Sequence, residues 1–299
     1  MQPYRYIICL TLFKQRHLST SWFTGICENQ LKVEYILFVY FLLFSVKTKV
    51  ISLYFIVMAN QSKSGKSLFD RSDKTSNCVS RLIFCLLRGI DPYIQYSLIF
   101  NGIGQELLSK VGLVSFSSGP KGTALVVMAG ACAFKQILNI TYILETNVPI
   151  SASITIGIYN TALNSLAGLS ALIYPPSNDL GPLQYVGISM FTVGLLAELV
   201  SELQRKQFKD NPQNQGKLYT GGLFSLARHI NYGGYTLWRT GLALTSGNYW
   251  LTALQFTWNM FDFTKRAVPE LSNYCSQKYG QQWTQYEHDV PNILIPFIW

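Results

Sequence analysis

Long apolar runs are the feature that most restricts the fold of this chain. Residues 123–144, 148–174 and 182–200 are each apolar enough, and near enough to the roughly 20 residues required, to cross a bilayer as a helix. A further run, residues 235–263, is expected to form a helical hairpin that turns at Ser246-Gly247-Asn248, because these residue types favour turns. Backbone in lipid must satisfy its own hydrogen bonds. The sequence therefore predicts an all-α, polytopic membrane bundle of about five to seven transmembrane helices.

The composition excludes other classes of protein. Only 13% of the 299 residues are charged, against about 25% in a soluble domain. The 18 Tyr, 18 Phe and 6 Trp argue against intrinsic disorder. The net charge of +9 is spread over short loops without a dense basic stripe, so we expect no nucleic-acid partner. Six scattered Cys and three separated His show no metal-ligand spacing, so we expect no metal.

The amino-terminal region differs from the rest of the chain. Residues 1–57 contain apolar runs that are too short to span a bilayer, and Met58 opens a polar, basic stretch. We expect Met58 to be the true start and residues 1–57 to be a mistaken upstream extension; an extra anchor helix is the alternative. The expected domains are then a cytosolic amino terminus at 58–80, transmembrane helices at 81–200 and a cofactor-binding region at 201–299.

Ionisable residues interrupt the expected spans at several points. Arg88, Asp91 and Pro92 predict a short helix, a turn at residues 89–92 and a second helical piece. Lys135 and Glu198 lie inside expected spans, where such residues tend to face a cavity or a partner. The basic residues before Arg81 and those between Glu202 and Arg228 predict that both segments lie on the cytosolic side.

Two sequence blocks near the carboxyl terminus are the most informative motifs. The block GGLFSLARHINYGG at 221–234 resembles the Gly-Leu-(Trp/Phe)…Arg-His-Pro-Asn-Tyr-x-Gly-Glu block of the steroid 5-alpha-reductase carboxy-terminal, DUF1295-like family of membrane reductases. The block KYGQQWTQYEHDVPNILIPFIW at 278–299 resembles the tail of that family, which sterol reductases share. Isoprenylcysteine carboxyl methyltransferases are related and carry a similar Arg-His-Pro block. The likeness covers about residues 195–299.

This chain departs from the family pattern at two positions. Ile230 stands where the family usually has proline, and Tyr235 stands where it usually has an acid. In the reductases that acid helps to hold the nicotinamide end of the cofactor. The resemblance therefore implies a different environment for the reactive ring in this chain, and a protein that keeps the fold without turnover is one reading of these departures.

The chemistry of the carboxy-terminal region suits a phosphorylated dinucleotide. Such a ligand carries about four negative charges, which Arg binds bidentately and Lys as a point charge. Asn231 can bond a carboxamide, aromatic rings can stack on bases, and Gly233 allows close backbone approach. Solvated loop cations and aromatic residues of the membrane interface are the alternative interpretation. The residues expected to bind NADPH are Arg205, Lys206, Lys209, Arg228, His229, Asn231, Tyr232, Gly233, Tyr279, Trp283 and Tyr286. Arg239 is expected beside the same loop.

The resemblance implies an NADPH-dependent reductase of a C=C bond in a steroid, sterol or other lipid, which reaches the site from the bilayer. The candidate proton donors are Tyr232, Tyr235, Glu198 and Tyr159. The rival is an S-adenosylmethionine-dependent methyltransferase of a lipid or prenylcysteine carboxyl. That cofactor has no phosphates, so the cation-rich loop favours the reductase. The expected location is the endoplasmic reticulum membrane, with several membrane passes.

Overall fold

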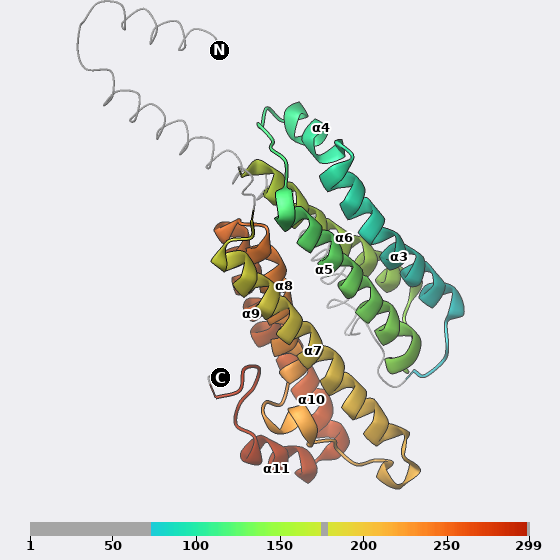
Figure 1. Cartoon of the computed structure of the whole chain (residues 1–299). Coiled ribbons are helices and arrows are strands. Elements are labelled where there is room, and N and C mark those ends of the chain that lie inside the picture. The colour runs from blue at the N-terminus through green and yellow to red at the C-terminus, as the bar shows by residue number, and fades with distance from the viewer. Residues whose placement is uncertain (1–72, 175–178, 298–299) are drawn as a thin grey trace, which may run out of the picture. The chain divides into compact units, whose positions relative to one another are not determined.

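The computed structural model describes residues 73–174 and 179–297, and every regular element in them is helical (Figure 1). The α-helices are α3 (Cys78–Phe100), α4 (Ile103–Lys110), α5 (Gly119–Leu138), α6 (Ile150–Ile173), α7 (Pro182–Asp210), α8 (Ile230–Thr245), α9 (Tyr249–Asp262), α10 (Val268–Tyr279) and α11 (Gln281–Asp289). The shorter turns are η1 (Asn139–Ile143), η2 (Pro212–Asn214), η3 (Gly222–Ser225) and η4 (Phe263–Ala267). The all-α prediction is confirmed for this part of the chain. The predictions for residues 1–57 and Met58 lie outside it.

Four of the described helices are long and apolar enough to cross a membrane: α3, α5 continued by η1, α6 and α7. The last three correspond to the three long spans predicted from the sequence. Helices α8 and α9, of 16 and 14 residues, are shorter than the roughly 20 residues of a full crossing. They form the predicted hairpin, which turns at Ser246-Gly247-Asn248 with Gly247 at φ 84°.

The turn predicted at residues 89–92 is wrong, because α3 runs through them with Pro92 inside the helix. Arg88 and Asp91 are both fully buried and pair at 3.1 Å, so their charges are satisfied within the protein and the chain need not leave the helix. The helix ends instead at Phe100, and Gly102, at φ 83°, is the N-cap residue of α4. Such a positive φ suits glycine, which has no Cβ to clash.

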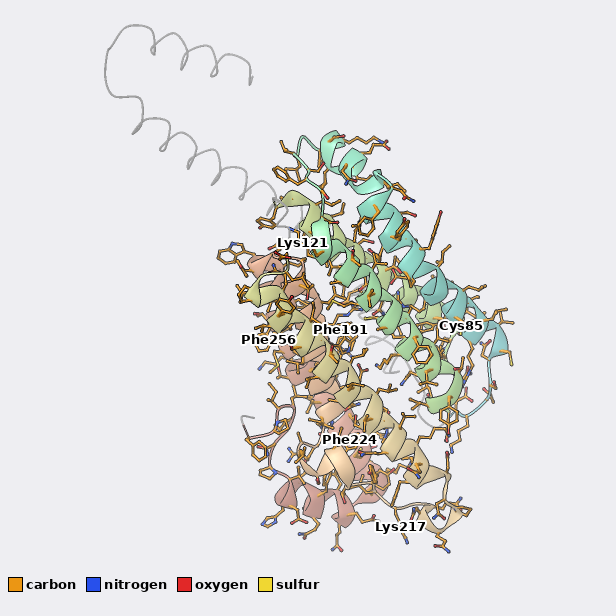
Figure 2. All side chains as sticks on the ribbon, viewed as in Figure 1. Cys85, Lys121, Phe191, Lys217, Phe224 and Phe256 are labelled. Carbon is orange, nitrogen blue, oxygen red and sulfur yellow. The ribbon has the colours of Figure 1, made fainter. Side chains whose placement is uncertain are left out.

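Helix α7 continues beyond Val200, the predicted end of its membrane span, and runs to Asp210. The extension is polar, and pairs one helical turn apart support it, such as Lys206 with Asp210 at 2.8 Å. Arg205, Lys206 and Lys209 therefore lie on a helix and not in a loop. Lys217 and Phe224 lie at this end of the helical body, and Lys121 lies at the other end (Figure 2).

Glycines bring the backbones of α7 and α8 into direct contact. A Cβ added at Gly194 of α7 would lie 2.5 Å from the backbone N of Trp238, and one added at Gly241 of α8 would lie 2.5 Å from the carbonyl O of Gly187. Small residues that allow such close approach are typical of helix contacts in lipid. Helix α9 packs in turn on α8, while α5 and α6 pack on α3. The α7–α8 contact is the support on which the carboxy-terminal site is built.

Candidate cofactor-binding site

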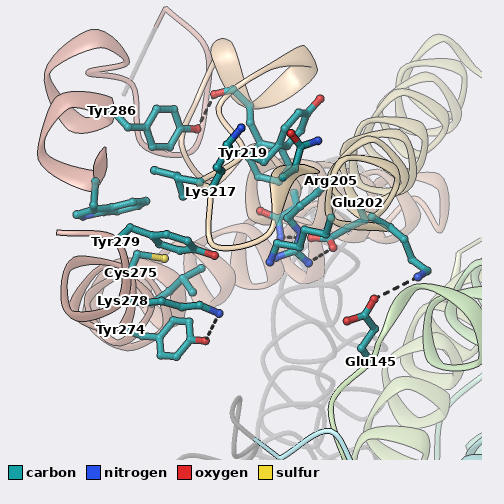
Figure 3. A pocket seen from close by; sticks show the side chains of 18 of the residues that line it. Glu145, Glu202, Arg205, Lys217, Tyr219, Tyr274, Cys275, Lys278, Tyr279 and Tyr286 are labelled. Atoms are coloured by element: carbon teal, nitrogen blue, oxygen red, sulfur yellow. Dashed lines mark hydrogen bonds and ion pairs between the residues drawn. The ribbon is translucent and has the colours of Figure 1, made fainter. Parts of the chain in front are cut away.

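A cavity of about 580 Å³ lies between the carboxyl end of α7, the segment before α8, and helices α10 and α11 (Figure 3). Its volume falls within the range of about 300–1,000 Å³ that is usual for small-molecule sites. The lining includes nine of the eleven residues predicted to bind a cofactor, namely Arg205, Lys206, Lys209, Arg228, His229, Asn231, Tyr279, Trp283 and Tyr286. The structure thus brings the predicted set together, while the role of each residue stays a prediction.

Glu202 forms an acidic centre in the cavity wall that the sequence did not reveal. Its carboxylate is ion-paired with Arg205 one turn along α7 and accepts a hydrogen bond of 2.7 Å from Nδ2 of Asn231. Glu202 is only 6% exposed. Oδ1 of Asn231 is buried and has no hydrogen-bond partner among the described atoms. The Glu202–Arg205 spacing was visible in the sequence, but the helix was expected to end before it.

Arg228 connects the carboxy-terminal tail to residues 228–232, which we call the RHINY segment. Its Nη1 donates to the carbonyl O of Glu287 at 3.1 Å and of Val290 at 2.8 Å. The backbone N–H of Arg228 donates to Asn292 O at 3.0 Å, and that of His229 donates to Ile293 O at 2.8 Å. Nη1 of this guanidinium therefore holds one wall of the cavity against another, while Nε is buried without a hydrogen-bond partner among the described atoms.

Aromatic side chains form the wall contributed by α10 and α11. Trp283 and Tyr286 are each 3% exposed, so they are enclosed by protein. The Tyr286 hydroxyl donates to Phe224 O at 2.6 Å and so holds η3 against α11. Burial raises the pKa of Tyr279, although Lys278 opposes this, and the phenol stays neutral near pH 7. A hydrogen bond to the Tyr274 hydroxyl raises the pKa of Lys278, which stays protonated.

Two predicted cofactor residues, Tyr232 and Gly233, lie outside the cavity lining. The Tyr232 ring stacks on Phe263 with a centroid distance of 4.7 Å and on His229 at 5.7 Å. At Gly233 a Cβ would collide with the carbonyl O of Leu294. The close backbone approach that this glycine allows is therefore made by the carboxy-terminal tail.

The other candidate proton donors also lie away from the cavity lining. The Tyr235 hydroxyl accepts a hydrogen bond from Nε of Arg239 at 3.3 Å. Glu198 is ion-paired with Lys135 and accepts from Nε1 of Trp238 at 2.6 Å. Tyr159 lies on α6. Lys135 and Glu198 are thus each other's partner, as residues of this kind inside a span were expected to have. A proton-donor role for Tyr235, Glu198 and Tyr159 stays a prediction.

A second polar region, the buried polar cluster, lies among the transmembrane helices. Asp91 pairs with Arg88 and accepts from Gln95 at 2.9 Å and from Asn164 at 2.7 Å. The members of the buried polar cluster are Arg88, Asp91, Gln95, Asn160, Asn164 and Arg239, each at most 4% exposed.

Arg239 was expected beside the cation-rich loop, and this prediction is wrong. The side chain is 2% exposed and belongs to the buried polar cluster, where it donates to Asn164 Oδ1 at 2.9 Å and to Asn160 Oδ1. Its position on α8, two turns beyond the RHINY segment, carries it away from the cavity and among the spans.

Metal-type clusters of three or more His, Cys, Asp or Glu side chains do not occur in the described ranges 73–174 and 179–297. The expectation that the protein binds no metal stays a prediction.

Comparison with known proteins agrees with the two sequence blocks. Residues 160–290 match the family described as a protein of unknown function, DUF1295. The chain is 34% identical over 252 residues to the probable O-methyltransferase ustE of Ustilaginoidea virens, covering 75% of this chain and 88% of that protein.

Two further relatives come from different enzyme classes. The chain is 27% identical over 185 residues to a probable protein-S-isoprenylcysteine O-methyltransferase of Oryza sativa subsp. japonica, covering 58% of this chain and 93% of that one. It is 30% identical over 88 residues to a 7-dehydrocholesterol reductase of Xenopus laevis, covering 29% of this chain and 18% of that one. The chain therefore belongs to the DUF1295 family of multi-pass membrane proteins, and its relatives in methyl transfer and sterol reduction are enzymes.

Proposed function

We propose that this chain is a membrane-embedded methyltransferase that uses S-adenosylmethionine to methylate an oxygen atom, in a carboxyl or hydroxyl group, of a lipid or other hydrophobic substrate. The observation that carries the proposal is the cluster of Glu202, Arg205 and Asn231 in the cavity wall. The amino-acid end of S-adenosylmethionine carries an ammonium and a carboxylate. A carboxylate beside an unsatisfied amide oxygen suits the ammonium, and a guanidinium suits the carboxylate.

The extent of the sequence likeness supports methyl transfer over reduction. The match to the O-methyltransferase extends over 252 residues, far more than the carboxy-terminal cavity region alone. The match to the sterol reductase extends over 88 residues and spans 18% of that protein. A relative that shares most of the helical body is a better guide to the whole reaction than one that shares a single segment.

The charges in the cavity also fit a dinucleotide less well than the sequence suggested. Lys206 contacts Glu145 at 3.3 Å, and Arg228 donates to backbone carbonyls. At the position of the reductase acid, Tyr235 packs on Trp238 with a ring-centroid distance of 5.0 Å and supplies no carboxylate. Two of the cations expected to bind phosphates, Lys206 and Arg228, thus already have partners.

In this proposal the protein binds the cofactor and the substrate, orients them toward each other and excludes water from the cavity. When bound, S-adenosylmethionine would supply an activated methyl group to a carboxylate oxygen, or to a hydroxyl oxygen that gives up its proton to solvent, and would leave as S-adenosylhomocysteine. Tyr279 offers a ring face for the adenine, while Glu202 and Arg205 hold the amino-acid end. The hydrophobic acceptor would reach the cavity from the bilayer, and we propose the endoplasmic reticulum as the membrane.

An NADPH-dependent reductase of a lipid C=C bond is the second candidate. One observation favours it: Lys209, Lys217 and Lys278 line the cavity and none of them forms an ion pair with a described carboxylate. Lysines of this kind can hold the phosphates of a dinucleotide as point charges.

Cofactor binding to the full chain in lipid nanodiscs tests the proposal. Isothermal titration with S-adenosylmethionine and with NADPH should show binding of the first and not of the second. Label from methyl-tritiated S-adenosylmethionine should then enter a membrane lipid extract. Binding of NADPH alone would support the reductase instead, and binding of neither would indicate a protein that keeps the fold without this activity.

A further inference from the structure

Three exposed lysines from separate parts of the chain line the cavity. Lys209 lies near the end of α7, Lys217 lies between η2 and η3, and Lys278 lies on α10. Figure 3 shows Lys217 and Lys278 on opposite walls. All three are exposed, and none forms an ion pair with a carboxylate in the part of the chain that the structure describes. We call these three residues the lysine rim.

The lysine rim is electrostatically unlike the other cations of the cavity. Arg205 and Lys206 each have a carboxylate partner, and Arg228 has two carbonyls. Lys209 lacks such a carboxylate partner; Arg205 and Lys278 repel it, while Glu202 attracts it at longer range than an ion pair. Like charges held near one another repel until an anion arrives, so the rim favours a negatively charged ligand.

The proposed cofactor does not account for this surplus of positive charge. S-adenosylmethionine has one carboxylate and no phosphate, and the proposed function assigns that carboxylate to Arg205, which lines the cavity. The oxygen that accepts the methyl group does not account for it either. Three ammonium groups around that oxygen would lower its nucleophilicity, and methylation of a carboxylate would leave the three lysines without an anion.

We propose that the lysine rim is a subsite for an anionic group, a phosphate or a second carboxylate, which the hydrophobic substrate carries in addition to the oxygen that is methylated. The inference rests on the proposed methyltransferase function. The anionic group holds the polar end of the substrate in the cavity while its apolar part remains in the bilayer. The chain would then select amphiphiles that have two polar groups over neutral lipids.

The test measures binding of dodecyl phosphate to the full chain in nanodiscs of neutral lipid, with inorganic phosphate and dodecanol as comparison probes. The variant is Lys209→Gln/Lys217→Gln/Lys278→Gln, and its control is Lys110→Gln, at an exposed lysine of α4 outside the cavity lining. Dodecyl phosphate should bind the triple variant at least about tenfold more weakly, because each exposed charge contact contributes modestly and three add up. The control should bind like the wild type, and the affinity for S-adenosylmethionine should change by less than about twofold in both variants.

The other outcomes are distinguishable. Unchanged binding of dodecyl phosphate to the triple variant overturns the subsite. An equal loss of S-adenosylmethionine binding also overturns it, since the lysines would then belong to the cofactor site. Inorganic phosphate binding as tightly as dodecyl phosphate assigns the rim to a soluble anion and overturns the substrate assignment. If the wild type fails to bind S-adenosylmethionine but binds dodecyl phosphate through the rim, the proposed function fails and the anionic subsite stands.

Discussion

The buried polar cluster and the cavity both collect charged side chains, but they differ in whether the protein itself satisfies those charges. In the cluster, Arg88 has Asp91 at 3.1 Å, and Arg239 has the amide oxygens of Asn160 and Asn164. In the cavity, the lysine rim has no carboxylate partner within the described ranges. Buried charges that hydrogen-bond to other protein groups hold helices together, whereas exposed charges that line a cavity without a counter-ion indicate where a ligand binds.

The two regions also differ in how they are built. The cluster lies on long helices, α3, α6 and α8, whose side chains meet across helix contacts. The cavity is assembled from a helix end, short turns and a tail, joined by bonds such as that from Tyr286 to Phe224 O at 2.6 Å. Substitutions in the cluster should therefore lower stability, and substitutions in the cavity should lower ligand affinity.

The largest effect is expected from Asp91→Leu, which leaves the Arg88 guanidinium buried without its counter-ion. Removing one partner of a buried ion pair costs about 3–5 kcal/mol of unfolding free energy. Asp91→Asn, which keeps an acceptor, should cost less. Unfolding in detergent measures both variants, and S-adenosylmethionine affinity of the folded fraction should stay unchanged. A loss below about 1 kcal/mol for Leu, within the range of ordinary surface substitutions, would show that the cluster is not structural.

Glu202→Gln should lower the affinity for S-adenosylmethionine more than it lowers stability, the opposite of what we expect for Asp91→Leu. It removes the charge that pairs with Arg205 and that we propose for the ammonium of the cofactor. Losing a charge-assisted hydrogen bond should weaken S-adenosylmethionine binding by about 1.5–3 kcal/mol, roughly tenfold or more in Kd. Titration calorimetry measures the affinity, and Glu106→Gln on α4, outside the cavity, is the matched control. Equal affinity for the variant and the wild type would remove Glu202 from the site.

Gly194→Ala tests the packing that supports both regions. The new Cβ would lie 2.5 Å from the backbone N of Trp238, so α7 and α8 must separate, at a cost of about 1–3 kcal/mol. Gly130→Ala on α5 is the control, because nothing lies within 4 Å of its Cβ and alanine is the better helix former. In thermal unfolding, the unfolding temperature of Gly194→Ala should lie well below that of the wild type, and that of Gly130→Ala should equal or slightly exceed it. The reverse order would rule out the close α7–α8 contact.

The smallest effect is expected at Glu145, which contacts Lys206 at 3.3 Å and Lys74 at 3.5 Å. Burial alone would raise the pKa of Glu145, but the two lysines outweigh it and the pKa is lowered. A lowered folded-state pKa means that the contribution to stability is present above the usual range of Glu, about pH 4.3, and is lost as the pH falls through the lowered value.

Glu145→Gln should therefore destabilise the protein by less than about 1 kcal/mol at pH 7, as is usual for exposed ion pairs. The difference from the wild type should vanish in acid. Unfolding titrations at several pH values measure this, and a difference that grows as the pH falls would contradict the assignment.

The transmembrane spans and the hairpin could be predicted from the sequence because apolar length and turn residues are local properties. The cavity residues could be predicted because two motifs carry a family likeness. Arg88 and Asp91 were misinterpreted as a break because their pairing inside α3 depends on packing with other helices. Glu202 was missed and Arg239 misplaced for a related reason: the extent of α7 and the direction of α8 are tertiary facts.

Footprinting of Cys275 tests most directly whether the cofactor binds in the cavity. Cys275 lines the cavity and is only 8% exposed, so a reagent reaches it through the cavity, whereas Cys78, at the start of α3, is exposed and lies outside the lining. The native protein in membranes is treated with a small alkylating reagent, and the rate at each cysteine is followed by peptide mass mapping. S-adenosylmethionine should slow alkylation of Cys275 and leave that of Cys78 unchanged. If saturating S-adenosylmethionine leaves Cys275 reacting at its original rate, the cofactor does not bind in this cavity.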